Sequence, residues 1–500
     1  MRRVLQLAAV LLAVVGLAWL FWPARYTVNG PILQQLLGRV PETPAEDAVL
    51  ARLKVPAGFT VTRFATDIPH VRFLRFTSAG DLLATQPRPG RVLLLRRDAD
   101  GDGRSDGTTT LFEPMERVHG LDLHDGWLYV ADSGRVRRAR FDAAERRLTT
   151  AFETVVDGLP AGGNHWTRTV AFGPDGALYV SIGSSCNVCV EKDARRAAIV
   201  RYDADGRNEQ VYANGLRNSV GFTWRPETGE MYATDNGRDL LGDDVPPCEL
   251  NRIEPGAFYG WPFANGDRVP DPDLGAGHEA DVARSVPPVH GFRAHNAPLG
   301  LTFVTSAALP ADYRGAAIVA LHGSWNRTRK DGYKVVSLHW RADGTIAERD
   351  FVIGFRQGDD VIGRPVDVAE GPDGAVYVSD DYGGAVFRVA YGHAPRAAST
   401  GPAGTATSAP AAPQTAAAFP AEALARGRAL YDRYECGLCH EREKAPRNVR
   451  PRPLVRLPER YDVETLAAYL KAPQPPMPAF PLSDAERGDL AMYLLGREAR

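Results

Sequence analysis

The chain has 500 residues, of which 44% are hydrophobic and 24% charged, and this composition excludes a disordered, collagenous or disulfide-stapled miniprotein. Its 59 basic and 61 acidic residues give a formal charge of −2, which argues against a nucleic-acid partner. Gly (49) and Pro (38) are abundant, so turns between many short strands are expected. The 5 Cys cannot all pair within one chain, so at least one has another use.

An apolar segment follows two basic residues at the N-terminus. Val4 to Trp22 is interrupted only by Gln6 and is long enough to cross a hydrocarbon core of ~30 Å as a helix. We therefore predict a signal anchor over residues 1–24 and a connecting segment over residues 25–50, with the chain beyond the anchor on the periplasmic side of a bacterial inner membrane. Cleavage as a signal peptide, which would leave the protein periplasmic, is the alternative.

A turn with Gly or Asp, followed by a short alternating strand, recurs along the next part of the chain. The third residues of the repeats are Leu82, Leu128, Leu178, Met231, Ala317 and Val376. Steps near 50 residues, built from short strands, are typical of propeller blades. We therefore predict a mainly β fold, a six-bladed β-propeller over residues 51–392, with a β-sandwich as the alternative. Extra residues within Asn251 to Ala308 predict a long loop on one face.

The C-terminal part of the chain differs in composition. Residues 393–420 are dominated by Ala, Pro, Thr, Ser and Gly and predict a flexible linker. Residues 421–500 show helical periodicity, and Ser483 with Glu486 forms a capping box. A small all-α domain is therefore expected there.

This helical part contains Cys436-Gly437-Leu438-Cys439-His440, the C-x-x-C-H attachment sequence of haem c. Its spacing lets the thiols of Cys436 and Cys439 bond the porphyrin while His440 places an imidazole under the iron. Met477, in a proline-rich loop, is the candidate sixth ligand, whereas Met492 is expected to pack in a helix core.

Residues 421–500 resemble class I cytochrome c domains in this motif, in the loop of Met477 and in the positions of Gly427, Tyr431 and Tyr493. The resemblance implies a contact between the first and last helices. A one-electron carrier on a linker also implies a redox partner domain, and the propeller is the obvious donor.

Four stretches of the propeller carry candidate chemistry. They are Gly162-Gly163-Asn164-His165-Trp166, Gly215-Leu216-Arg217-Asn218, Glu249-Leu250-Asn251 followed by Tyr259-Gly260-Trp261-Pro262, and Arg364-Pro365-Val366-Asp367 before the second Gly-Pro-Asp-Gly turn. In their order and spacing they resemble the glucose/sorbosone dehydrogenase family, propellers that bind pyrroloquinoline quinone (PQQ) and calcium. The resemblance covers about residues 55–390.

This resemblance implies residue roles. His165 would be the general base that takes the substrate hydroxyl proton as hydride leaves for the quinone, and Arg217 would stabilise charge on the quinone oxygen. Asn218 would hydrogen-bond PQQ. The cofactor carboxylates would pair with Arg327, Lys330 and Arg364, although the first two lie in a loop longer than that of the family. Calcium would be held by the main-chain carbonyls of Gly237 and Arg238, where the family pattern leads one to expect Gly-Pro.

One further departure concerns the R-x-R-D motif of the family, because Val366 stands where its second Arg is expected. The three remaining Cys predict a local disulfide between Cys186 and Cys189 that leaves Cys248 unpaired, although either could pair with Cys248 instead. The acidic stretch Asp98 to Asp102 begins like an EF-hand loop but has Thr109 in place of the bidentate Glu. It is either a structural calcium site or a solvated turn.

The sequence as a whole predicts a PQQ-dependent quinohaemoprotein dehydrogenase. The substrate would be a sugar, sugar aldehyde or lactol, oxidised by hydride transfer to the quinone. The electrons would pass to the c-type haem and on to a respiratory acceptor, a quinone or another cytochrome. The alternatives are a calcium-dependent propeller lactonase, which would give no reason for a fused haem, and a non-catalytic propeller that binds a ligand or protein and displays a cytochrome c.

Overall fold

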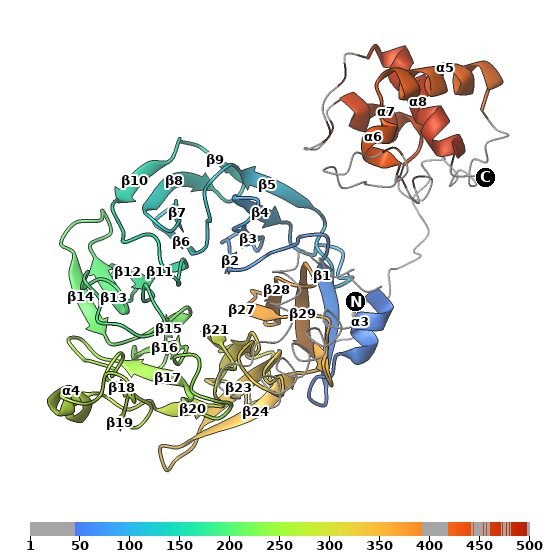
Figure 1. The fold of residues 1–500 in the computed structure, drawn as a ribbon. Helices are drawn as coiled ribbons and strands as arrows, with labels where there is room; N and C mark the ends of the chain where they lie inside the picture. Colours follow the sequence, from blue (N-terminus) through green and yellow to red (C-terminus); the bar gives the residue numbers. More distant parts are fainter. Residues whose placement is uncertain are drawn as a thin grey trace, which may run out of the picture. The chain divides into compact units, whose positions relative to one another are not determined.

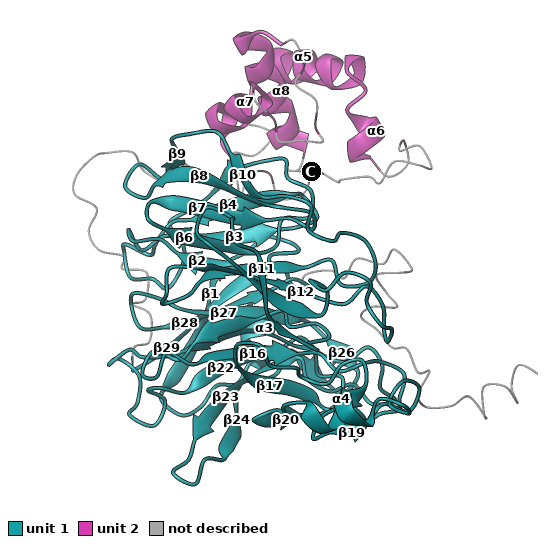
Figure 2. Cartoon of the chain, turned by 90° about the vertical axis from the view of Figure 1, so that its left-hand side faces the viewer, with its two compact units in different colours: residues 1–399 teal, residues 400–500 magenta. Residues whose placement is uncertain are grey.

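The computed structural model describes residues 46–392, 419–441, 461–471 and 482–497, with residues 444, 454, 457, 473, 477 and 480. The chain divides into two compact units, residues 1–399 and 400–500, drawn in different colours in Figure 2. The anchor predicted over residues 1–24 and the linker up to residue 418 lie outside the described residues. Among the described helices, none is long and apolar enough to cross a membrane.

The first unit is a ring of antiparallel sheets around a central axis, as Figure 1 shows. Blade 1 contains β2 (Leu74–Phe76), β3 (Leu82–Gln86), β4 (Arg91–Leu95) and β5 (Thr108–Phe112). Blade 2 contains β6 (Leu121–His124), β7 (Trp127–Ala131), β8 (Val136–Asp142) and β10 (Glu153–Val156), with β9 (Arg147–Leu148) beside β8. Blade 3 contains β11 (Arg168–Phe172), β12 (Leu178–Ile182), β13 (Ala198–Tyr202) and β14 (Gln210–Asn214).

The ring continues with three further blades. Blade 4 contains β15 (Phe222–Trp224), β16 (Met231–Asp235), β17 (Cys248–Ile253) and β20 (His290–Phe292). Blade 5 contains β21 (Pro298–Phe303), β22 (Ala317–Leu321), β23 (Lys334–Trp340) and β24 (Ile346–Val352). Blade 6 contains β27 (Pro365–Glu370), β28 (Val376–Asp380), β29 (Ala385–Tyr391) and β1 (Phe59–Ala65). The predicted six-bladed propeller is thus confirmed, and the sandwich alternative is wrong.

The ring closes by pairing the two ends of the propeller sequence. Strand β1 pairs antiparallel with β29, with Phe59 opposite Tyr391 and Val61 opposite Val389. The last blade therefore takes its outermost strand from the start of the propeller, and the hydrogen bonds of that pair join blade 6 to the N-terminal end of the ring. In Figure 1, β1 (blue) accordingly lies beside the orange strands.

The repeat found in the sequence is the second strand of each blade. Leu82, Leu178, Met231, Ala317 and Val376 each begin one of these strands, and Leu128 is the second residue of β7. The two Gly-Pro-Asp-Gly segments are the turns between first and second strands of blades 3 and 6. In both turns the first Gly donates its N–H to the Ala after the turn, at 2.9 and 2.8 Å.

The second strands carry the core of the propeller. Every residue of β3, β12, β16, β22 and β28 is buried, because each blade packs between two neighbours and has no solvent face at this depth. Near the axis, four blades contribute one apolar residue each to a common cluster, Phe73, Val220, Leu299 and Val366. This small cluster is separate from the larger clusters that form the blade cores.

The long loop predicted within Asn251 to Ala308 is an insertion between β17 and β20. It contains β18 (Ala264–Asn265), β19 (Val269–Pro270) and α4 (Glu279–Arg284). Two other small elements border the ring, a ribbon of β25 (Arg356–Gln357) and β26 (Asp360–Val361) and the helix α3 (Glu46–Arg52). Val49 of α3 is buried in the core shared by blades 5 and 6, so the end of the predicted connecting segment packs on the propeller.

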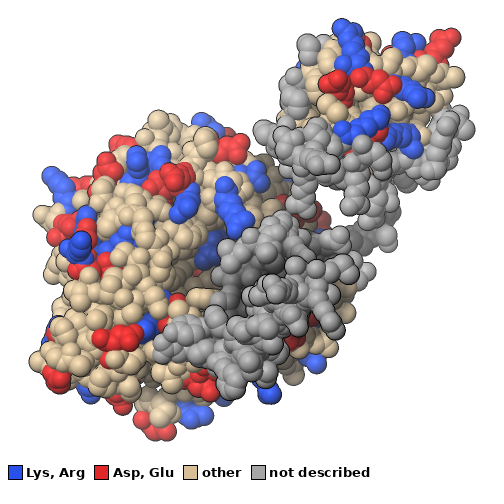
Figure 3. All heavy atoms as spheres, in the orientation of Figure 1, with Lys and Arg blue, Asp and Glu red and all other residues tan. Residues whose placement is uncertain are grey.

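Charged side chains are interspersed by sign on the propeller face seen in Figure 3. Many are paired along the strands, as in Arg201 with Asp175 (2.9 Å) and Arg388 with Asp373 (2.8 Å). Exposed pairs of this kind add little stability and chiefly keep the surface polar.

The second unit contains α5 (Ala421–Arg433), α6 (Gly437–His440), α7 (Val463–Lys471) and α8 (Asp484–Arg497). The first and last helices cross closely at Gly427, where a Cβ would lie 2.1 Å from the carbonyl oxygen of Asp489. The rings of Tyr431 and Tyr493 are 5.6 Å apart, which confirms the predicted contact between these helices. The capping box is also present, since Glu486 accepts the N–H of Ser483 at 2.8 Å.

Candidate functional site

The topology of the blades brings the predicted site residues to one end of the propeller. His165 precedes β11, Arg217 precedes β15 and Arg364 precedes β27, so all three stand at the start of a first strand. Because first and second strands are antiparallel, the residues that follow a second strand reach the same end. Ser184 after β12 and Asp381 after β28 are such residues. The propeller thus collects polar groups at this end from positions far apart in the sequence.

His165 is held as a neutral imidazole. Its Nδ1 lies 2.9 Å from the carbonyl oxygen of Ser184 and 2.9 Å from the Ser184 hydroxyl. That hydroxyl donates its proton to the carbonyl of Cys186 at 2.7 Å, so both groups near Nδ1 are acceptors. Nδ1 therefore carries the proton and Nε2 keeps its lone pair. Burial, with repulsion from Arg217, lowers the pKa of His165 to about 3.

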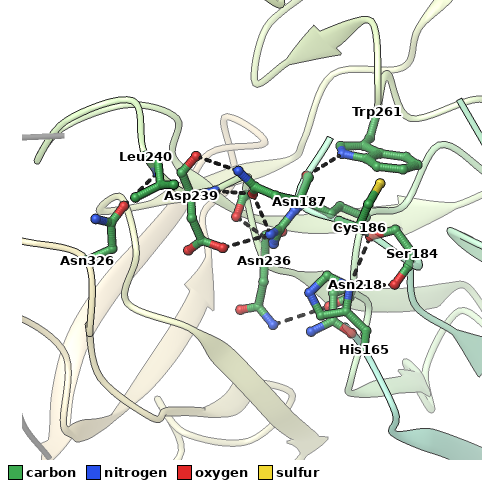
Figure 4. A network of polar contacts seen from close by, with 12 residues as sticks. His165, Ser184, Cys186, Asn187, Asn218, Asn236, Asp239, Leu240, Trp261 and Asn326 are labelled. Atoms are coloured by element: carbon green, nitrogen blue, oxygen red, sulfur yellow. Dashed lines mark hydrogen bonds and ion pairs between the residues drawn. The ribbon is translucent and has the colours of Figure 1, made fainter. Parts of the chain in front are cut away.

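The predicted cofactor ligand Asn218 lies next to His165 (Figure 4). A Cβ on Gly183 would come within 2.6 Å of both the Asn218 amide oxygen and Cβ of His165. Only glycine therefore permits this close approach of the β12 end to the two side chains. The backbone of Asn218 is fixed as well, because its N–H donates to the Asp235 carboxylate at 2.6 Å.

Arg217 is buried and has an acceptor on every side. Its Nη2 pairs with Asp239 at 2.8 Å and donates to the side-chain oxygen of Asn187 at 2.9 Å. Its Nε donates to the Asn187 carbonyl at 2.9 Å, and its Nη1 donates to the carbonyls of Asn236 (3.2 Å) and Gly237 (2.9 Å). The guanidinium is therefore held in one orientation before any ligand arrives. We call His165, Ser184, Arg217, Asn187 and Asp239 the His165 group; most of them are labelled in Figure 4.

Asp235 fixes the turn that carries Arg217. Its carboxylate accepts the N–H of Arg217 at 2.9 Å as well as that of Asn218. Burial raises the pKa of Asp235 to about 7, although these hydrogen bonds favour its charged form. The sequence signal for this role was the position of Asp235 at the end of the repeated strand motif.

A disulfide links Cys186 and Cys189, as predicted, and Cys248 is unpaired and buried. The short ring that it closes contains Asn187, which contacts Arg217 through both its carbonyl and its side chain. Trp261 also donates its Nε1–H to the Asn187 carbonyl at 3.3 Å. The sequence analysis missed Asn187, and its place between two paired Cys was the only signal that could have pointed to it.

A second set of charged residues surrounds Asp381. Arg364 lies 3.0 Å from the Asp381 carboxylate, Arg72 lies 2.9 Å from it, and His322 lies 3.1 Å from it. We call these four residues the Asp381 group. All of them line a cavity of about 770 Å³, and so does Trp166, the neighbour of His165 in sequence.

The charge of the Asp381 group is set by its arginines. Burial raises the pKa of Asp381, but Arg364, His322 and Arg72 outweigh this effect and hold it well below its usual range. Burial lowers the pKa of His322 to about 4, so this imidazole is neutral at pH 7. The sequence analysis found Arg364 but missed Arg72, His322 and Asp381, which carry no motif and are recognisable only by their place at strand ends.

The other two predicted carboxylate ligands are held elsewhere. Buried Arg327 donates to the carbonyls of Asp243 and Ala294 and lies 3.3 Å from the Asp244 carboxylate. Lys330 donates to the carbonyl of Asp359 at 2.5 Å. Neither is among the described residues that line the cavity of the Asp381 group. Their assignment to PQQ stays a prediction.

One of the carbonyls predicted to bind calcium already accepts a hydrogen bond from an arginine. The Gly237 carbonyl accepts a hydrogen bond from Arg217, so a cation bound there would lie beside a guanidinium. The side chain of Arg238 is bound on both sides of its fork by Asp271 (2.7 Å) and Asp273 (2.8 Å). The calcium assignment to these two carbonyls therefore stays a prediction that the charge of Arg217 opposes.

The acidic turn after β4 places ligand atoms of Asp98, Asp100 and Asp106 within 4.8 Å of one another. The carboxylate of Asp98 accepts the N–H groups of Gly101 (2.7 Å) and Gly103 (2.8 Å). Such bonds are typical of a solvated Asx turn as well as of a calcium loop, so both alternatives stay open.

In the helical unit, Cys436, His440 and Met477 line one pocket of about 160 Å³. The other lining residues are aromatic or aliphatic, among them Tyr461, Leu466 and Phe480. The described Cys436 and Cys439 form no disulfide, and Met492 is not among the residues that line the pocket. The fold thus brings three of the four predicted haem ligands to one apolar pocket, with Cys439 one helical turn away from Cys436 on α6.

The propeller was compared with known proteins. The family model described as Glucose / Sorbosone dehydrogenase matches residues 127–388. An uncharacterized protein of Borreliella burgdorferi is 36% identical over 219 residues, 43% of this chain and 57% of that protein. A pyrroloquinoline quinone-dependent pyranose dehydrogenase of Coprinopsis cinerea is 26% identical over 405 residues, 67% of this chain and 54% of that protein. The chain thus spans little more than half the length of these curated relatives.

Solved structures share the propeller fold. The holo form of the PQQ domain of the Coprinopsis cinerea enzyme matches with a TM-score of 0.59 at 23% identity, over 70% of this chain and 98% of that one. The soluble aldose sugar dehydrogenase of Escherichia coli, in its apo form, matches with a TM-score of 0.53 at 19% identity, over 68% and 100%. With the family model covering more than half of the residues, the chain belongs to the glucose/sorbosone dehydrogenase family.

Proposed function

We propose that this chain is a quinohaemoprotein dehydrogenase, in which the propeller oxidises a sugar, sugar aldehyde or lactol with PQQ and the helical unit carries a c-type haem. The observation that supports it best is that one chain joins two sites of matching chemistry. The propeller of this chain holds His165, with its pKa lowered, near the fixed Arg217, and the helical unit has Cys436, His440 and Met477 on one pocket.

The His165 group has the groups that oxidation of an alcohol or lactol needs. When bound, PQQ would supply the two-electron acceptor for the carbon that bears the substrate hydroxyl. His165 would accept the hydroxyl proton at Nε2, because Nδ1 is already protonated by its contacts with Ser184. Arg217 would stabilise negative charge at the reacting centre, and it needs no reorganisation because Asn187 and Asp239 already hold it.

The propeller cavity fits an anionic cofactor. Four arginines line it, Arg72, Arg88, Arg117 and Arg364, against two carboxylates, those of Glu116 and Asp381. A ligand with several carboxylates would match this surplus of positive charge. Asn218 would hydrogen-bond the same ligand next to His165. Calcium would accompany PQQ as in the family, at ligands that would include the main-chain carbonyls of Gly237 and Arg238.

The pocket of the helical unit has a lining that would suit a porphyrin. Apart from Cys436, His440 and Met477, the described residues that line it are tyrosines, leucines and a phenylalanine. Cys436 and Cys439 would form the thioether bonds, His440 and Met477 would be the axial ligands, and the haem would take electrons one at a time from the propeller.

We further propose that the protein lies outside the cytoplasm. The segment over residues 1–24 would anchor it on the periplasmic side of a bacterial inner membrane, and the acceptor of its electrons would be a respiratory quinone or another cytochrome. The disulfide between Cys186 and Cys189 supports this proposal, because such bonds persist in oxidising compartments.

An anaerobic reduction experiment tests the proposal. The full chain, matured with haem in a bacterial periplasm, is incubated with calcium and PQQ. A panel of sugars, sugar aldehydes and sugar lactones is then added while the haem absorption and the hydrolysis of the lactones are followed. We expect reduced haem only when PQQ and a substrate are both present, and none in the absence of PQQ.

Three results would contradict the proposal. If the purified chain carries no covalent haem, the proposed electron transfer to haem is wrong. If haem is reduced without PQQ, the proposed role of PQQ is wrong. Hydrolysis of a lactone without haem reduction would favour the lactonase alternative.

A further inference from the structure

The two arginines of the Asp381 group share one carboxylate. Arg72 and Arg364 both contact Asp381, and their side chains are 12% and 10% exposed, against 7% for Asp381. Asp367 and Asp380 lie close enough to act on this group by charge, but their carboxylates accept backbone N–H groups and pair with neither guanidinium. Among the described residues, Asp381 is therefore the carboxylate that both arginines must share.

The two arginines also have donors to spare. Arg364 uses Nε (3.1 Å) and Nη2 (3.0 Å) on Asp381, and Arg72 uses Nη1 (2.9 Å). Within the described residues no acceptor faces Nη1 of Arg364 or Nη2 of Arg72, and Nε of Arg72 is buried without a hydrogen-bond partner. Asp381 thus holds each guanidinium by one edge, and the donors that remain belong to side chains that line the cavity.

Arg72 also lies where an aromatic ligand could be recognised. Its guanidinium carbon is 5.8 Å from the centre of the Trp166 ring, and Trp166 lines the same cavity. Trp166 follows His165 directly in the chain, although His165 is not itself among the described residues that line this cavity. Val366, at the position where the family pattern has its second arginine, is instead fully buried in the apolar cluster with Phe73.

We propose that Arg72 and Arg364, oriented by Asp381, form a binding site for the carboxylate of an aromatic polycarboxylate. Arg72, which comes from blade 1, supplies there the second cation that blade 6 lacks because of Val366. The identification of this ligand as PQQ rests on the proposed function, but the carboxylate site itself does not.

Isothermal titration calorimetry on the full chain, purified without PQQ and with calcium present, tests this site. The probes are PQQ and benzene-1,2,4-tricarboxylate, which has carboxylates on an aromatic ring but no quinone. We expect Arg72→Gln to weaken the binding of both probes roughly 10- to 100-fold, the range for loss of a charge-assisted hydrogen bond. Arg72→Lys should show a smaller loss of affinity, because the lysine ammonium keeps the positive charge but cannot donate two parallel hydrogen bonds to a carboxylate.

A matched control removes one positive charge at a distance. Arg349 on β24 is half exposed and pairs with Asp312 at the surface, so Arg349→Gln should leave both affinities unchanged. If Arg72→Gln does not fold, as judged by circular dichroism, Arg72→Lys decides alone, and unchanged affinities in that variant would overturn the inference.

The outcomes separate the two proposals. Binding of PQQ by the wild type with no loss in the Arg72 variants would overturn the role of Arg72 and leave the proposed function standing. Binding of the tricarboxylate but not of PQQ by the wild type, with a loss in the variants, would uphold the carboxylate site and contradict the proposed function. If the wild type binds neither probe, both proposals are wrong.

Discussion

The His165 group and the Asp381 group lie at the same end of the propeller but use arginine in different ways. Arg217 has acceptors on Asn187, Asn236, Gly237 and Asp239 for all of its nitrogens. Arg72 and Arg364 share the single carboxylate of Asp381. A fully paired guanidinium is fixed in place and can stabilise charge at a reacting atom, whereas an underpaired one is suited to holding a ligand. The comparison suggests that one group is built for chemistry and the other for binding.

The largest effect should come from the proposed base. We expect His165→Ala to lower the rate of substrate-dependent haem reduction about 10²- to 10⁴-fold, the usual contribution of a general base, with little change in PQQ affinity. Stopped-flow spectroscopy and calorimetry measure the two quantities. His124→Ala is the control, because His124 ends the first strand β6, at the opposite end of the propeller from the start of β11, and its ring stacks on Phe172, so neither quantity should change. Loss of PQQ affinity in the His165 variant would show that the His165 group also binds the cofactor, which contradicts the division of roles between the two groups.

The second prediction compares how much Arg217 and Arg364 each contribute to the free energy of unfolding. Arg217→Gln removes the partner of Asp239 and leaves several buried acceptors unpaired, so it should lower the free energy of unfolding by about 3 kcal/mol. Arg364→Gln should cost less than about 1 kcal/mol, because Arg72 and His322 still contact the Asp381 carboxylate. Urea unfolding of the two variants without ligand measures both. Equal losses would show that the two groups do not differ in this way.

The third prediction concerns the residue that positions Arg217. Asn187→Ala removes one side-chain acceptor of the guanidinium but keeps the carbonyl, so we expect kcat to fall roughly 10-fold with KM nearly unchanged. Asn187→Asp keeps an acceptor and should recover part of the rate. A change in KM alone, or no recovery in the Asp variant, would argue against positioning.

The smallest expected effect is a flat pH profile. Because burial and Arg217 lower the pKa of His165 to about 3, the base is neutral throughout pH 5 to 7, and kcat/KM should not fall there through its protonation. The lowered pKa also means that the stability associated with neutral His165 is present above pH 6.5 and is lost as the pH falls through 6.5 towards 3. NMR titration of ¹³C-labelled histidines, with His165→Ala for assignment, measures the pKa. A value near 6.5 would place His165 in a wetter environment than the structure has.

Local patterns predicted much of this architecture. The second strands begin within one residue of the repeat positions Leu82, Leu128, Leu178, Met231, Ala317 and Val376, because turn chemistry and period-2 alternation are encoded over a few residues. The local disulfide and the contact at Gly427 were predicted for similar reasons, from residues close in sequence or from a family pattern.

Residues that act through distant partners were not predictable in this way. Arg72 and Asp381 are separated by most of the propeller sequence, and they meet because β1 closes the ring against β29 and brings blade 1 beside blade 6. Asn187 contacts Arg217 only because the ends of β12 and the start of β15 reach the same end of neighbouring blades. The sequence by itself therefore determined the blades, the family motifs and the C-x-x-C-H segment. Only the tertiary structure decided which charges share a partner, because burial and pairing depend on ring closure rather than on neighbours in the chain.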